Sequence, residues 1–311
     1  MKKSLHFVGG LLGLMTFFPL SARAYFNADT GYDARVTGLG WAFTGMADSV
    51  DAAGENNAGL ATLRRPVIGF SVVTPVRQES TYQTVVTYPL ASRWTLYAMG
   101  TTTFEHYNIR IQSHEFVLGA AVRAFDYHAL RVSGGLGLKV LSATLSGVQG
   151  MDAHGFGLDL GLLARLKLPK GYGQALQLGL SVLNQGETVK YDYGVHEKIP
   201  ATKNVGLAYY ILDNLSVAWA FNHTVFINNY NGDFILENND VGAEWTVWKG
   251  RVALRGGMFR QQRYHASENG SLGFGLRFRG FTFDYAYANL IRHTSWDARF
   301  IHHRFGFSCS L

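Results

Sequence analysis

Cysteine is almost absent from this chain: among 311 residues there is only Cys309. A single cysteine excludes an internal disulfide and any site built on paired cysteines, so packing and hydrogen bonds must hold the fold together. Cys309 lies in a strand-like segment at the C-terminus. We expect it to act as a small hydrophobic side chain and not as a nucleophile.

Long apolar runs are also lacking, apart from one at the N-terminus. No later segment approaches the roughly eighteen consecutive apolar residues of a transmembrane helix, which argues against a helical membrane bundle. The one run, residues 5–20, follows two lysines and precedes the triplet Ala22–Ala24, so residues 1–24 are predicted to be a cleaved secretory signal. A membrane anchor is the alternative, but the run is short and is interrupted by glycine and Pro19.

Charge is sparse as well. Charged residues make up only 16% of the chain, whereas aromatic residues reach 14% and glycine contributes 36 residues. Loss of Lys2, Lys3 and Arg23 with the signal lowers the net charge from +6 to +3, which is too little to argue for a nucleic-acid partner. An exported chain of this composition belongs in the periplasm, outside the cell or in the outer membrane.

From residue 65 onward, large apolar residues alternate with small or charged ones, which is the period of a β-strand. In SLGFGLRFR, residues 271–279, four large apolar side chains share one face, while glycine, serine and arginine occupy the other. A soluble β-sandwich also alternates, but strands of about ten residues or more favour a transmembrane barrel with a polar interior. The charged residues expected to face that interior are Arg123, Arg131, Lys139, Asp159, Glu244, Arg255, Arg277 and Asp284.

The connections between these segments support the barrel. Longer loops alternate with short turns, and the segments number about fourteen, an even count that places both chain ends on the periplasmic side. Residues 65–311 are therefore predicted to form an antiparallel, all-β transmembrane barrel. Aromatic residues near the expected strand ends suit a membrane-interface girdle; they are Tyr88, Trp94, Tyr97, Tyr127, Tyr209, Tyr210, Trp245, Trp248, Tyr285 and Trp296.

A helix-prone stretch rich in small residues, GLGWAFTGMADSVDAAGENNAGLATL at residues 38–63, precedes the strands. A barrel of about fourteen strands is too wide for its own side chains to fill, so residues 25–64 are predicted to form a short helical plug in the lumen. Asp48 is expected to cap a helix that ends at Gly54, and Asn57 to cap a second turn. A mobile periplasmic tail is the alternative, although such tails seldom combine helix caps with large aromatic side chains.

The same stretch resembles the N-terminal signature of the FadL-like outer-membrane barrels, in particular of their PorV/PorQ branch. The matching residues are Gly38, Gly40, Ala42, Phe43, Ala47, Asp48, Asn56 and Ala58–Leu60, whereas Asn57 stands where that branch usually has proline. Residues 199–222, 242–258 and 270–288 follow a similar strand-turn-strand pattern. The alternating Phe305, Phe307, Cys309 and Leu311 resemble the C-terminal signal that the barrel-assembly machinery recognises, although that signal usually ends in an aromatic residue.

This resemblance implies an outer-membrane barrel, expected to be a monomer, whose N-terminal segment acts as a hatch. It also implies two alternative functions. One is the passage of hydrophobic, fatty-acid-like small molecules when the hatch shifts; the other is an accessory role beside proteins of a secretion or surface-attachment system. The residues predicted to form the hatch and meet a ligand are Gly38, Gly40, Trp41, Phe43, Met46, Asp48, Asn56, Asn57 and Gly59.

Motifs of catalysis and cofactor binding are weak or missing. The Gly-x-Gly triplets at residues 135–137, 155–157 and 273–275 lie inside strand patterns with no following helix, so close approach of the plug explains them better than nucleotide binding. There is no Gly-x-Ser-x-Gly elbow, and the adjacent His302 and His303 would point to opposite faces of a strand. A hydrolase built from scattered serine and histidine is the remaining enzyme alternative. We expect no catalytic residue, cofactor or metal.

Overall fold

The computed structural model describes residues 33–74, 79–90, 93–106, 110–146, 152–169, 171, 173–186, 188–191, 196–226, 234–261, 267–292 and 298–311. The predicted signal, the first part of the predicted plug (residues 25–32) and Trp296 lie outside these described residues. Within them, no helix has both the length and the apolar character needed to span a membrane.

Fourteen long strands form one closed antiparallel barrel, which confirms the predicted fold class and strand number. The strands are β1 (Val67–Thr74), β2 (Glu79–Pro89), β3 (Trp94–His106), β4 (Arg110–Tyr127), β5 (Leu130–Ser146), β6 (Ala153–Lys167), β7 (Ala175–Gly186), β10 (Ala201–Leu212), β11 (Leu215–Phe226), β12 (Phe234–Val247), β13 (Val252–Gln261), β14 (Ser267–Phe278), β15 (Phe281–Arg292) and β16 (Ala298–Ser310). β1 pairs with both β2 and β16, and β5 pairs with both β4 and β6. Closure therefore leaves no long unpaired edge.

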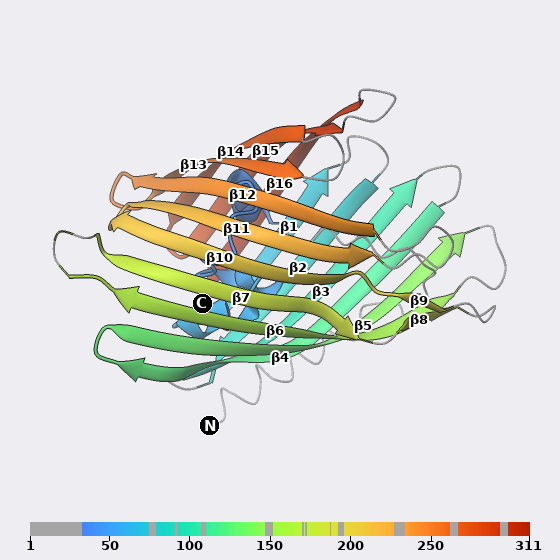
Figure 1. Cartoon of the computed structure of the whole chain (residues 1–311), viewed down its shortest axis with the longest axis horizontal. Helices are drawn as coiled ribbons and strands as arrows, with labels where there is room; N and C mark the ends of the chain where they lie inside the picture. Colours follow the sequence, from blue (N-terminus) through green and yellow to red (C-terminus); the bar gives the residue numbers. More distant parts are fainter. Residues whose placement is uncertain are drawn as a thin grey trace.

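Short turns join the strands at one end of the barrel, which lies at the left in Figure 1. Asp213 and Asn214 connect β10 to β11, and Arg279 and Gly280 connect β14 to β15. The C-terminus lies at this end too, because the Leu311 N–H donates to the carbonyl of Pro66, just before β1. This arrangement matches the predicted end with short turns.

Two short strands occur in addition to the fourteen strands of the barrel. β8 (Thr188–Tyr191) and β9 (His196–Lys198) pair with each other, and β8 also pairs with the start of β6. They lengthen the wall at the end opposite the short turns. Their few residues carry too little period-two pattern to be recognised in the sequence.

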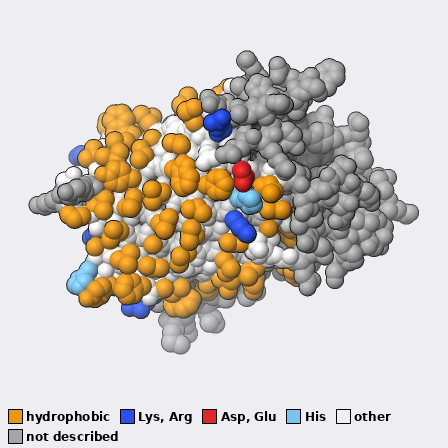
Figure 2. All heavy atoms as spheres, viewed as in Figure 1, with side chains coloured by type: hydrophobic (Ala, Val, Ile, Leu, Met, Phe, Trp, Pro, Cys, Tyr) orange, Lys and Arg blue, Asp and Glu red, His pale blue; other side chains and the backbone are white. Residues whose placement is uncertain are grey.

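The two faces of the barrel differ as predicted. Large apolar side chains cover the exterior, where Leu272 is 67% exposed and Phe156 is 66% exposed. Figure 2 shows them as a broad band on one side of the molecule. A water-soluble protein rarely exposes apolar surface of this extent, so the exterior suits hydrocarbon. Five of the charged side chains that the sequence predicted to face the interior are buried: Lys139, Asp159, Glu244, Arg255 and Asp284.

The hydrophobic core lies inside the barrel, where residues 33–63, called the plug from here on, meet the wall. Figure 1 shows this blue segment enclosed by the strands. Among the described residues, the four largest completely buried side chains all belong to the plug: Phe43, Leu39, Met46 and Leu60. Burial of such a side chain stabilises a fold by about 1.5–3 kcal/mol. The plug therefore supplies the core that a barrel of this width lacks.

The plug is built from three short helical turns: α2 (Ala34–Gly38), η1 (Val50–Ala53) and η2 (Asn57–Thr62). Asp33 caps α2, because its carboxylate accepts a hydrogen bond from the Arg35 N–H at 2.7 Å. The same carboxylate accepts a bond from the Ser71 hydroxyl on β1 at 2.5 Å. The cap thus also attaches the start of the plug to the barrel wall.

The helix caps predicted within the plug were wrong. η1 is a 3₁₀ turn whose N-cap is Ser49 and not Asp48, although Gly54 ends it as predicted. η2 begins at Asn57, and its N-cap Asn56 makes no side-chain cap bond. The physical reason is competition, because the side chains of Asp48, Asn56 and Asn57 form tertiary hydrogen bonds instead.

Candidate functional site

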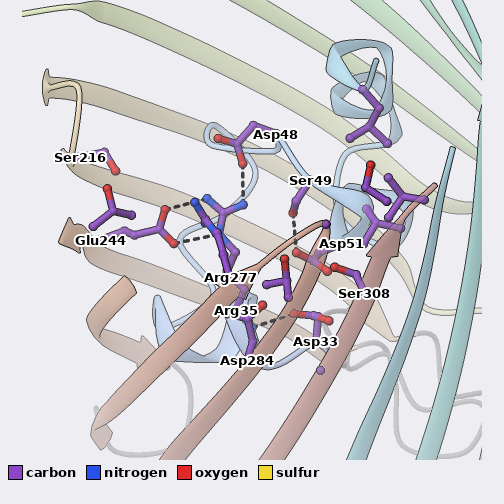
Figure 3. A pocket seen from close by; sticks show the side chains of 18 of the residues that line it. Asp33, Arg35, Asp48, Ser49, Asp51, Ser216, Glu244, Arg277, Asp284 and Ser308 are labelled. Atoms are coloured by element: carbon purple, nitrogen blue, oxygen red, sulfur yellow. Dashed lines mark hydrogen bonds and ion pairs between the residues drawn. The ribbon is translucent and has the colours of Figure 1, made fainter. Parts of the chain in front are cut away.

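An ion-pair network centred on Arg35 joins the plug to three strands. Arg35 binds Glu244 of β12 in a bidentate manner, with Nε–Oε2 and Nη2–Oε1 distances of 2.9 Å each. Glu244 also accepts from Arg255 of β13 at 2.6 Å, and Arg255 in turn binds Asp284 of β15 at 2.6 Å. Figure 3 shows Arg35 between Glu244 and Asp48, with dashed lines to both. We call these residues the Arg35 network.

Arg35 also contacts two residues of the plug itself, Asp48 and Phe43. Its Nη1 lies 2.6 Å from Asp48, and its guanidinium carbon lies 5.4 Å from the centre of the Phe43 ring. Burial by itself lowers the pKa of Arg35, but the carboxylates of Asp48 and Glu244 outweigh it and raise the pKa above its ordinary value. Arg35 therefore stays charged in the lumen and holds both carboxylates.

Glycine pairs let the plug backbone touch the wall backbone. At Gly257 of β13, an added Cβ would lie 2.3 Å from the nitrogen of Gly40, a residue whose φ of +61° suits glycine. At Gly206 of β10, an added Cβ would lie 2.4 Å from the nitrogen of Gly45. Both distances are too short for any side chain, so the plug fits this wall only where the wall has glycine.

Two asparagines tie the end of the plug to the opposite side of the barrel. The Asn56 amide donates to the carbonyl of Leu162 on β6 at 3.0 Å. The Asn57 amide donates to the Tyr97 hydroxyl on β3 at 3.0 Å. Together with the Arg35 network, these bonds attach the plug to walls on both sides of the lumen.

Two tyrosines assigned from the sequence to an aromatic girdle face inward instead. Tyr97 is only 2% exposed and binds Asn57. The Tyr210 hydroxyl donates to the Met46 carbonyl at 3.3 Å, and Arg165 lies 4.3 Å from its ring centre. The girdle assignment was wrong for these two because each occupies an inward position in its strand, which proximity to a strand end does not reveal. Trp248, in contrast, faces outward and is 79% exposed, and its place in an interface girdle stays a prediction.

Trp41 is held by an aromatic and a cationic contact. Its ring lies 4.6 Å from the ring of Phe259 in an edge-to-face arrangement, and the Arg304 guanidinium lies 5.0 Å above it. Its φ of +63° is uncommon for a side chain of this size and follows the left-handed Gly40. This pair of residues forms a tight bend that directs the chain along β13.

A cavity of about 530 Å³ lies beside the Arg35 network, at the end with short turns. Plug residues line one side and the turn between β10 and β11 lines another. Figure 3 shows Asp33, Asp51 and Arg277 among its side chains. The cavity is therefore lined largely by polar side chains.

Two plug carboxyls, the buried Glu55 and the partly buried Asp51 beside the cavity, have raised pKa values. Burial raises the pKa of Glu55 to about 8, with the charge of Arg304 acting in the opposite direction. Burial likewise raises the pKa of Asp51 above its ordinary value, and the nearby Asp33 adds to the effect. Both acids are thus easier to protonate in the plug than in water.

The overall fold of this chain is similar to that of channels of known structure. The chain is similar to the "CymD monoaromatic hydrocarbon channel", with a TM-score of 0.67, 12% identity and coverage of 90% of this chain and 98% of that one. It is also similar to the Ralstonia pickettii toluene transporter TbuX, with a TM-score of 0.59, 15% identity and coverage of 91% and 99%.

A Pseudomonas aeruginosa FadL homologue gives a TM-score of 0.56 at 11% identity, with coverage of 93% and 99%. The fold is therefore shared with solved hydrocarbon channels and with this FadL homologue. No protein-family model matches this chain, and no curated protein matches it in sequence. At such low identities the likeness concerns the fold alone. The PorV/PorQ branch therefore stays a prediction.

The nine predicted hatch residues all lie in the plug, and the structure brings several of them against the wall. Phe43 and Met46 are completely buried, so in this arrangement a ligand would reach them only after the plug moved. Gly38 packs against Gly273 of β14, and Gly59 packs on the carbonyl of Ala47. Contact of these residues with a ligand stays a prediction.

Arg35 was missed in the sequence, although the wall residues that it joins were correctly expected to face inward. A lone arginine between a cap and a glycine-rich stretch gives no signal of its function. Among the described residues, no group of three or more histidine, cysteine, aspartate or glutamate side chains is arranged to hold a metal ion.

Proposed function

We propose that this chain is an outer-membrane barrel that passes hydrophobic small molecules through its lumen when the plug shifts. The observation that carries the proposal is the way in which the plug is held. It contacts the wall through buried apolar side chains, one ion-pair network, a few hydrogen bonds and glycine-to-glycine contacts, with no strand pairing, and it borders a cavity on the short-turn side. Such a segment can be displaced without breaking any strand pairing.

Two further points support this function. The apolar exterior suits a bilayer, and the fold is shared with channels whose names refer to monoaromatic hydrocarbons and toluene. For this chain we propose a hydrophobic substrate class that includes fatty-acid-like molecules. The partner in this function is the bilayer itself, and no covalent chemistry is required.

Deletion of residues 28–61 from the mature chain tests the proposal. The intact and shortened proteins are placed in liposomes at equal amounts, and ion conductance and uptake of a hydrophobic dye are measured. We expect both to increase in the shortened protein, because a lumen of about fourteen strands is open once unplugged. Heat-modifiable gel mobility checks that the shortened barrel is folded. Equal conductance and uptake in the two folded proteins would contradict the proposal.

The accessory function beside a secretion system is separated from transport by purification. Gentle solubilisation from membranes followed by mass spectrometry should give the barrel with lipid or another apolar molecule bound, and without a stoichiometric protein partner. A partner protein present in equal amount would favour the accessory function instead.

A further inference from the structure

The inner wall of β10, β11 and β12 is polar beyond its contacts with the plug. These three strands are neighbours in the barrel (Figure 1). The plug backbone touches the wall at Gly206 of β10 and Gly242 of β12, and Ala220 of β11, opposite Gly206, is completely buried. Toward the end opposite the short turns, the next two inward positions on each strand all carry polar side chains: Thr202, Asn204, Asn222, Thr224, Asn238 and Asp240.

Three asparagines lie side by side across these strands. In the strand register Asn204 is opposite Asn222, and Asn222 is opposite Asn238. Neighbouring strands are about 4.8 Å apart, so the three amides span about 10 Å of the inner wall. We call Asn204, Asn222 and Asn238 the amide row. A row of this length can bond a small polar group from more than one side.

The amide row has hydrogen-bonding capacity left over. The Asn204 amide donates to the Ser181 hydroxyl of β7 at 3.0 Å, and the Asn222 amide donates to Asp240. The carbonyl oxygens of Asn204 and Asn238, and one carboxyl oxygen of Asp240, are buried and accept no hydrogen bond within the described part of the chain. Buried polar groups almost always have a partner, so these oxygens favour a ligand that donates hydrogen bonds.

An apolar cluster borders the amide row. Leu141 and Ala143 of β5, Ala153 of β6 and Ile199 form this cluster, and all four are buried. Ile199 lies three residues before Thr202, next to the start of β10. A site that combines apolar side chains with a few polar groups holds the apolar body of a ligand and orients it by its polar group. This half of the lumen therefore suits an amphiphilic molecule.

Two acidic groups lie near the amide row. Asp240 is bonded to Asn222, and the charge of the plug residue Glu55 acts on Asp240. Arg304 of β16 is the cation whose charge acts on Glu55, and its guanidinium lies over the Trp41 ring. An ionised carboxylate would meet acidic groups at the row, whereas a neutral hydroxyl would not be repelled.

We propose that the amide row recognises a hydroxyl group, so that the preferred substrates are hydrophobic alcohols and phenols. This rests on the proposed function above, because the amide oxygens are buried and a ligand would reach them only after the plug moved. A hydroxyl donates to an amide oxygen and accepts from an amide nitrogen, so it fits an asparagine in either orientation of its amide. A bare hydrocarbon leaves the amide oxygens without a partner and binds more weakly.

Competition for dye uptake tests this preference. The full mature chain is placed in liposomes, and uptake of a hydrophobic dye is measured with increasing free concentrations of para-propylphenol, propylbenzene or phenylpropanoate. These competitors share an aromatic ring and a short alkyl chain, and they differ in carrying a hydroxyl, no polar group or a carboxylate. The variants are Asn238→Leu and Asn204→Leu/Asn238→Leu. The matched control is Asn239→Leu, which removes the neighbouring amide on the outward face of β12.

We expect propylphenol to inhibit dye uptake at an about tenfold lower concentration than propylbenzene, and at a lower concentration than phenylpropanoate, in the intact protein and in Asn239→Leu. Asn238→Leu should reduce this preference, and the double variant should abolish it. Heat-modifiable gel mobility checks that each variant is folded.

Two kinds of result separate this inference from the proposed function. Equal inhibition by propylphenol and propylbenzene, stronger inhibition by phenylpropanoate, or an unchanged preference in the double variant would overturn the inference and leave transport of hydrophobic molecules standing. Absence of dye uptake by the intact protein would overturn the proposed function, and this inference with it.

Discussion

Replacing Arg35 by methionine should loosen the plug while the barrel stays folded. The variant loses the bidentate contact between Arg35, which is 6% exposed, and Glu244, which is 8% exposed. It also loses the contact with Asp48, which is 29% exposed. Removing one partner of a buried ion pair costs about 3–5 kcal/mol. Glu244 keeps Arg255 at 2.6 Å, and the half-buried Asp48 adds a smaller share because water partly screens it. We therefore expect a cost to plug docking of about 2–3 kcal/mol, an increase of roughly 30- to 150-fold in the undocked population.

Conductance in planar lipid bilayers measures this population. The Arg35→Met barrel should spend a correspondingly larger fraction of time in an open state, and hydrophobic dye uptake should rise with it. The double variant Arg35→Met/Glu244→Gln should recover part of the loss, because it removes the carboxylate that the single variant leaves with one partner fewer. Heat-modifiable mobility should be that of the intact protein in each case.

Arg277→Met is the matched control. Arg277 lines the same cavity and faces inward, but its side chain forms no ion pair within the described residues. It should therefore leave conductance unchanged. If Arg35→Met and Arg277→Met have equal effects, or if Arg35→Met conducts like the intact protein, the Arg35 network does not hold the plug.

Two further predictions address the backbone contacts and the buried acid. Gly257→Ala should raise conductance, because its Cβ would lie 2.3 Å from the Gly40 nitrogen and weaken docking by about 1–3 kcal/mol. The control is the neighbouring Gly256→Ala, which should leave conductance unchanged because its Cβ meets nothing closer than 3.8 Å. Equal effects of the two substitutions would contradict this reasoning. The pKa of Glu55, raised by burial to about 8, means that its protonated form stabilises docking. Docking of the plug should be strongest below the ordinary carboxyl pKa and should weaken as the pH rises through about 8, so conductance should increase over that range. Glu55→Gln should abolish this pH-dependent increase in conductance. A Glu55→Gln variant with the pH profile of the intact protein would contradict the prediction.

The barrel was predictable because its signals are local. The pleat of a strand forces side chains to alternate, so residues 271–279 alone reveal an exposed apolar face and a buried polar one. The strand number followed from repetition of that pattern, and the plug from the contrast between residues 38–63 and the strands. Tyr97 and Tyr210 were misplaced because alternation shows that two sets of side chains point to opposite faces. Near a strand end, the sequence does not show clearly which of the two sets points inward.

By itself, the sequence determined the class of the fold, the division between outward apolar and inward polar side chains, and the presence of a plug. Only the tertiary structure decided how the plug is held. Arg35 and Glu244 lie 209 positions apart, and Asn57 and Tyr97 lie on different elements. Such partners meet only after the register of all fourteen strands is set and the barrel has closed around the plug. Local periodicity depends on neighbouring residues, whereas these contacts depend on that closure.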